Sequence, residues 1–168
     1  MTRARCRWGF RGLLAAAMLA CGAAQDDTVY AAQAKAEAVD ISVIMVTASG
    51  SGGRAEFDPR IPATLRQQLA RLPLSYNRYG FLGAPRQTTP MGAACLFPLP
   101  DSESLSICPS VPTPGARVVR LDTRILDPAR RPILTSQMRI GYGAIFLLHR
   151  PKGPSGLLLG VSAFAVER

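Results

Sequence analysis

The chain has 168 residues, of which 48% are hydrophobic and 18% are charged, and its formal net charge is +9. This length suits one domain of ordinary size, and the hydrophobic fraction excludes an intrinsically disordered chain. The 15 glycines and 14 prolines imply many turns and short elements, which argues against a long helical bundle.

The first 24 residues have the pattern of a secretory signal peptide. Four arginines precede an apolar run over residues 13–20, and small residues at positions 22–24 offer a cleavage site. The apolar run is about half of the roughly 20 residues that span a bilayer, so we expect no permanent membrane helix. We therefore predict export to the periplasm or the extracellular space, and a mature chain that begins with a flexible leader over residues 25–38.

An alternative fate for this segment is lipidation. Residues 18–21, Met-Leu-Ala-Cys, resemble the lipobox of bacterial lipoproteins, in which the cysteine is lipidated and becomes the new N-terminus. Lipidation of Cys21 would anchor the protein in the envelope.

The charge left after cleavage bears on partners. Without residues 1–24, 16 basic and 11 acidic residues remain, which gives a net charge of +5. The basic residues are nearly all arginines and are scattered along the chain, whereas nucleic-acid binding favours a clustered stripe with stacking aromatics. We therefore predict no nucleic-acid partner. An envelope protein or an anionic envelope polymer fits this charge better.

The predicted domain covers residues 39–168 and opens with a strand. Ile41, Val43, Ile44 and Val46 lie in a nearly continuous β-branched run, which indicates a strand buried on both faces. The glycine-rich loop over residues 49–53 then follows. It lacks the lysine of a phosphate-binding loop, so we predict a flexible connection there.

One amphipathic helix is predicted over residues 59–72. Asp58 is a good N-cap and Pro59 suits the first helical position. The apolar residues recur at spacings of four, four and three, which places them on one face of the helix: Ile61, Leu65, Leu69 and Leu72.

The rest of the chain is predicted to form short strands separated by Pro and Gly clusters. The last two are expected to form a terminal hairpin and, being apolar, to lie centrally in the sheet. The predicted strands are 74–82, 93–99, 105–111, 117–126, 133–140, 144–149 and 157–166. The expected fold is α+β, a mainly antiparallel sheet or sandwich of seven to eight short strands with one amphipathic helix packed on it.

Two cysteines remain after cleavage, and we predict that they form a disulfide. If residues 100–103 form a four-residue hairpin loop, Leu99 faces Ser104 and Cys95 faces Cys108. Such a bridge would stabilise the fold by about 3 kcal/mol. Two free buried thiols or one reactive thiol are the alternatives. These cysteines and one histidine make no closed zinc site, so we predict neither a metal nor a cofactor.

Candidates for chemistry are few. His149 is the only histidine, and we expect it at the surface at the end of a strand. The acidic residues form no evident catalytic pair, because Asp58, Asp101 and Glu103 are accounted for by capping and turns. We therefore predict no catalytic residues.

The segment over residues 75–81, Ser-Tyr-Asn-Arg-Tyr-Gly-Phe, is the most promising interaction surface. Its candidate residues are Tyr76, Arg78, Tyr79 and Phe81, because interfaces favour Tyr and Arg. A half-buried strand whose aromatics pack under the helix is the alternative interpretation.

The order of these features resembles a group of small exported bacterial proteins without an assigned activity, found especially in soil deltaproteobacteria such as myxobacteria. The shared features are the apolar first strand, the short helix that begins Asp-Pro, the strand at residues 75–79, and the Gly-rich apolar last strand. The resemblance covers roughly residues 39–166. It implies export and a small β-rich domain, and it implies no activity.

The sequence thus predicts an exported, non-enzymatic envelope protein that binds or assembles with another envelope component. One alternative is a small hydrolase or polymer-modifying enzyme that uses His149 or an aspartate in a cleft. Another is a lipid-anchored accessory subunit of a secretion or transport complex.

Overall fold

The computed structural model describes residues 38–110 and 117–166, all of which belong to the unit Gln33–Arg168. The predicted signal peptide, residues 1–24, and the lipidation candidate Cys21 lie outside the described residues. So does the predicted leader except for Ala38, which already belongs to the first strand.

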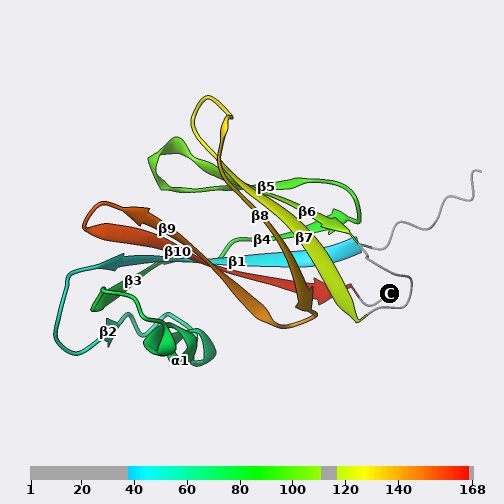
Figure 1. The fold of residues 1–168 in the computed structure, drawn as a ribbon. Coiled ribbons are helices and arrows are strands. Elements are labelled where there is room, and N and C mark those ends of the chain that lie inside the picture. Colours follow the sequence, from blue (N-terminus) through cyan, green and yellow to red (C-terminus); the bar gives the residue numbers. More distant parts are fainter. Residues whose placement is uncertain (1–37, 111–116, 167–168) are drawn as a thin grey trace, which may run out of the picture. The chain divides into compact units, whose positions relative to one another are not determined.

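The described residues form ten strands and one α-helix, with the strands in two sheets (Figure 1). The six-stranded sheet contains β1 (Ala38–Ser49), β2 (Glu56–Phe57), β3 (Arg78–Gly83), β4 (Arg86–Pro90), β9 (Ile145–Lys152) and β10 (Ser155–Ala165). The four-stranded sheet contains β5 (Cys95–Pro98), β6 (Ser104–Ser110), β7 (Val118–Leu126) and β8 (Pro132–Gly141). The α+β class is as predicted, but the strand number of seven to eight was too low.

Two hydrophobic cores lie on the two faces of the six-stranded sheet. On β1, Val39, Ile41 and Val43 point into the core shared with the four-stranded sheet, whereas Ile44 and Val46 point into the core under the helix α1 (Ala63–Arg71). Side chains alternate between the faces of a strand, so every second residue of β1 serves each core. The prediction that this strand is buried on both faces is confirmed.

The terminal hairpin is confirmed, but its two strands differ in position. β9 and β10 pair antiparallel, and β10 lies between β1 and β9, so β9 is an edge strand and not a central one. β9 is apolar because both of its faces are covered. Phe146 and Leu148 contact the core between the sheets, and Ile145 and Leu147 contact the core under α1.

The two additional strands carry no hydrophobic pattern. β4 has the sequence Arg-Gln-Thr-Thr-Pro and is mostly exposed, and β2 has two residues. Both β3 and β4 pair with the same edge of β1, β3 with residues 45–49 and β4 with residues 38–42. Backbone pairing to β1 holds β4 in place, and only its Thr89 is buried.

The helix begins four residues later than predicted. The N-cap is Pro62, whose φ of −54° and ψ of 142° are not helical. A residue before proline is disfavoured in the helical conformation, so Pro62 keeps Ile61 out of the helix. The apolar face of the helix is confirmed at Leu65 and Leu69, which are buried. Ile61 is also buried but precedes the helix, and Leu72, after its end, is exposed.

Asp58 therefore caps no helix. Its carboxylate accepts hydrogen bonds from the Arg60 backbone N–H at 2.9 Å and the Arg60 guanidinium at 2.8 Å. These bonds hold the pKa of Asp58 well below its usual range, and a weaker bond from the Phe81 N–H acts in the same direction. Asp58 thus ties the segment before α1 to β3.

The register of the β5–β6 hairpin differs by one residue from the prediction. A 3₁₀ turn, η1 (Pro100–Ser102), and a bond from the Leu99 N–H to the Glu103 carbonyl lengthen the loop, and Pro98 pairs with Ser104. Cys95 is therefore opposite Ile107, not Cys108. Ile107 points into the core, so the adjacent Cys108 points to the other face.

Neither Cys95 nor Cys108 forms a disulfide in the structure. The Cys95 Sγ donates to the Ile107 carbonyl at 3.4 Å, and the Cys108 Sγ donates to the Gly92 carbonyl at 3.4 Å. The disulfide stays a prediction, and in this register it requires the edge strand β5 to shift along β6.

The two thiols should differ in reactivity in the reduced protein. Burial raises the pKa of Cys95 to about 11, so at neutral pH it is protonated, and the thiolate is the nucleophile. We expect iodoacetamide to modify Cys108 at least about tenfold faster than Cys95 in the folded chain, and equally fast in urea. Mass spectrometry after timed quenching measures both rates. Equal rates in the folded chain would contradict the register, and failure of both thiols to react without a reductant would establish the disulfide.

Candidate functional site

The most developed site is built around a contact between Tyr76 and His149. His149 lies on β9 on the same face as Ile145 and Leu147, the face that α1 covers. Tyr76 lies in the connection between α1 and β3. The Tyr76 hydroxyl and the His149 Nε2 are 3.2 Å apart, and the two rings meet edge to face with centroids 5.6 Å apart. His149 is half-buried and not a free surface residue.

Tyr76 is fixed by contacts at both of its ends. Its hydroxyl donates to the Ser155 carbonyl at 3.1 Å, and its own carbonyl accepts from the Tyr79 hydroxyl at 3.2 Å. The Tyr79 ring in turn stacks on Phe57, with centroids 4.7 Å apart. The position of the phenol is therefore set by β10 on one side and by an aromatic pair in the core on the other.

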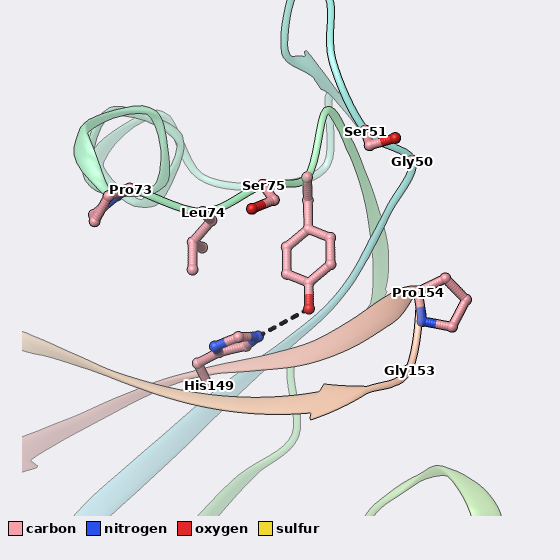
Figure 2. A pocket seen from close by; sticks show the side chains of 9 residues that line it. Gly50, Ser51, Pro73, Leu74, Ser75, His149, Gly153 and Pro154 are labelled. Carbon is pink, nitrogen blue, oxygen red and sulfur yellow. Dashed lines mark hydrogen bonds between the residues drawn. The ribbon is translucent and has the colours of Figure 1, made fainter.

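These two side chains border a pocket of about 490 Å³, shown in Figure 2. Three segments distant in sequence form its wall: the loop after β1, the connection after α1, and the last part of β9 with the β9–β10 turn. The lining residues are Gly50, Ser51, Pro73, Leu74, Ser75, Tyr76, His149, Gly153 and Pro154. This volume lies within the range of small-molecule pockets.

The glycine-rich loop that forms part of the wall is attached to Asn77. The Asn77 side chain donates to the Gly52 carbonyl, and its backbone N–H donates to the Ser49 carbonyl at 3.2 Å. Gly50 has a φ of +73°, and a Cβ at this position would collide with the Asn77 side-chain oxygen. This loop was predicted to be only a flexible connection. Its contacts with Asn77 hold it beside the pocket.

The predicted interaction surface divides into different environments. Tyr79 is buried in the core under α1, and Tyr76 belongs to the pocket. Arg78 is exposed, with its Nε 3.9 Å from Glu56. Phe81 is half-buried and lies under the Arg60 guanidinium, 5.2 Å from the ring centroid. Only Tyr76 therefore belongs to the site.

A second cluster of charged side chains joins the two sheets. Glu103, which is buried, forms ion pairs with Arg150 and with Lys152, whose Nζ is 3.5 Å away. The Lys152 Nζ is also 2.5 Å from Asp101, which is exposed. The turn residues of the β5–β6 hairpin thus contact β9. Sequence reasoning assigned Glu103 to a turn and missed this role.

Among the described residues, no group of three or more His, Cys, Asp or Glu side chains is placed to hold a metal ion. No helix in residues 38–110 and 117–166 has the length and hydropathy that a membrane crossing requires.

Scans of the chain against protein-family models, curated proteins and solved structures found no match. The similarity to small exported bacterial proteins stays a prediction from the sequence.

Sequence reasoning selected Tyr76 as an interaction residue and placed His149 at a strand end, but it did not bring them together. They are 73 positions apart in the chain. Their contact depends on the β9–β10 register and on the path of the connection after α1, and neither has a local sequence signal.

Proposed function

We propose that this protein is exported and non-enzymatic, and that it binds another envelope component through the pocket at Tyr76 and His149. The pocket itself carries the proposal, because it combines apolar walls with a few convergent polar groups, which is typical of binding sites. The export signal in residues 1–24 supplies the compartment, and the net charge of +5 after its removal favours an anionic polymer or a protein of the envelope as the partner.

Affinity capture from the host envelope tests this function. The bait is the protein expressed from its full coding sequence. His149→Phe keeps a ring of similar size and removes both nitrogens, so we expect it to retain at least about tenfold less envelope material than the wild type. Arg139→Ala serves as the control, because Arg139 is exposed on β8 of the other sheet. Equal capture by the wild type and His149→Phe would contradict the proposal.

A small envelope hydrolase is the second candidate, and one observation favours it. His149 borders a pocket, where its imidazole could serve as a general base. The wild type and His149→Phe also separate the hydrolase from the binding protein. Each is incubated with envelope polymers, and the products are analysed. A hydrolase loses about 100-fold or more of its turnover in His149→Phe, whereas a binding protein gives no turnover with either.

The third candidate, a lipid-anchored accessory subunit, depends on Cys21. Mass spectrometry of the mature N-terminus decides it. A lipid on Cys21 supports the anchor, and an unmodified N-terminus at Gln25 excludes it.

A further inference from the structure

The direction of the hydrogen bonds around His149 points to the kind of ligand that the pocket accepts. Resting on the binding function above, we propose that the pocket binds a neutral sugar unit, and that His149 Nδ1 accepts a hydrogen bond from one of its hydroxyls. Any anionic groups of the same polymer would lie outside the pocket.

The hydrogen-bond donors can be assigned because one partner is a carbonyl. The Ser155 carbonyl only accepts, so the single proton of the Tyr76 hydroxyl is directed to it. The 3.2 Å contact between the Tyr76 oxygen and His149 Nε2 then requires the proton on Nε2. Neutral His149 is therefore protonated on Nε2, and Nδ1 is an acceptor.

Nδ1 has no partner within the described part of the chain. The hydrogen bond of the imidazole to Tyr76 uses the other ring nitrogen, Nε2. Nδ1 is also not among the fully buried polar atoms that lack a partner. Nδ1 is therefore not fully buried, and it belongs to a residue that lines the pocket. An occupant with a hydroxyl donor would satisfy it.

The charge of the wall favours a neutral occupant. The lining contains no Asp, Glu, Lys or Arg side chain. The neighbouring cations Arg150 and Lys152 are held by Glu103 and Asp101. An anion in the pocket would therefore meet no unpaired cation there, and burying it without one would be costly.

The remaining wall suits the two kinds of surface that a sugar ring presents, its hydroxyls and its C–H faces. Figure 2 shows the side chains of Leu74 and Ser75 on the side of the pocket that His149 faces, and the hydroxyl of Ser51 directed away. Ser75 offers a hydroxyl that donates or accepts, and Leu74 offers an apolar surface. The site is a partly open pocket between three separate segments and not a groove along a strand edge, which favours a compact ring over an extended peptide.

Gly156 is the positioning residue of this site. A Cβ at Gly156 would lie 2.8 Å from the Tyr76 hydroxyl oxygen and 2.9 Å from His149 Nε2, closer than a real Cβ allows. Gly156→Ala should therefore push the two side chains apart and release the imidazole from its fixed tautomer. Gly141→Ala is the matched control, because a Cβ at Gly141, at the end of β8, comes no closer than 4.0 Å to its neighbours.

The test is an NMR titration of the protein expressed from its full coding sequence. The imidazole nitrogens of His149 are observed by ¹⁵N detection at alkaline pH. The neutral probes are glucose and N-acetylglucosamine, the anionic probes are glucuronate and glucose 6-phosphate, and a neutral alanine peptide represents a protein ligand. We expect the free protein to show the Nε2–H tautomer. We expect the neutral sugars to bind and to shift Nδ1, and to bind about tenfold more weakly in His149→Phe and Gly156→Ala but not in Gly141→Ala.

The outcomes separate this inference from the proposed function. Binding only by the anionic sugars, binding only by the peptide, or an Nδ1–H tautomer would overturn the sugar assignment. If none of the probes binds while envelope material is still captured in a His149-dependent manner, the sugar assignment fails and the proposed function stands. If no envelope material is captured either, both fail.

Discussion

Replacing Phe97 by alanine should lower the free energy of unfolding by about 3–5 kcal/mol, the largest effect we expect from a single substitution. Phe97 on β5 has no exposed surface, and it packs in the core between the two sheets. Its truncation removes apolar contacts and leaves a cavity between the two sheets, and the packed strands relax only in part to fill this cavity. Urea unfolding followed by circular dichroism measures the change.

The neighbouring residue provides a control on the same strand. Leu96 is 48% exposed, so Leu96→Ala should change the free energy of unfolding by less than about 1 kcal/mol. Equal losses from the two substitutions would contradict the alternation of β5, and with it the placement of Cys95 in the core.

Glu103→Gln should cost about 3 kcal/mol of folding stability. Glu103 is buried and pairs with Arg150, whose side chain is only 19% exposed, and with Lys152. The amide keeps the shape of the carboxylate but removes its charge, so a mostly buried guanidinium loses its partner. Because the pair is shielded from solvent, the loss should persist at high salt.

Asp101→Asn is the matched control for this effect. Asp101 also pairs with Lys152, but its side chain is 70% exposed, and exposed pairs contribute at most about 1 kcal/mol. Urea unfolding of the two variants at low and high salt compares them directly. A smaller loss in Glu103→Gln than in Asp101→Asn would show that the contact between the hairpin turn and β9 contributes little.

Several elements follow from local sequence patterns. The β-branched run of β1 predicts burial on two faces, and the spacing of Leu65 and Leu69 predicts the helix face that packs on the sheet. The Gly153–Pro154 turn between apolar runs predicts the last hairpin. In each case a hydrophobic period or a turn residue is present in the segment itself.

Other features arise from contacts that no local pattern contains. β4 is polar and is held by backbone bonds to β1, so hydrophobic periodicity misses it. Asp58 is a good capping residue, but α1 begins only after Pro62. The reason is that a proline disfavours the helical conformation in the residue before it. One additional loop residue before Ser104 moves Cys95 away from Cys108, because register in a hairpin depends on loop length.

The candidate site belongs to this second group. Aromatic and polar composition directs attention to Tyr76, but its partner His149 and the positioning residue Gly156 come from the last hairpin. The close approach of a Tyr–His pair to a glycine is visible only in three dimensions. The predicted last strand began at residue 157, so Gly156 was assigned to a loop. In the structure it lies on β10, where a glycine within a strand often marks the close approach of another group.

The central claim is that an envelope component binds at the Tyr76–His149 pocket, and chemical-shift mapping of the protein with its captured component tests it most directly. We predict that the perturbed backbone amides gather at Gly50, Ser75, Tyr76, His149 and Gly153, while those of the four-stranded sheet stay unchanged. Perturbations confined to the four-stranded sheet, with the pocket amides unmoved, would contradict it.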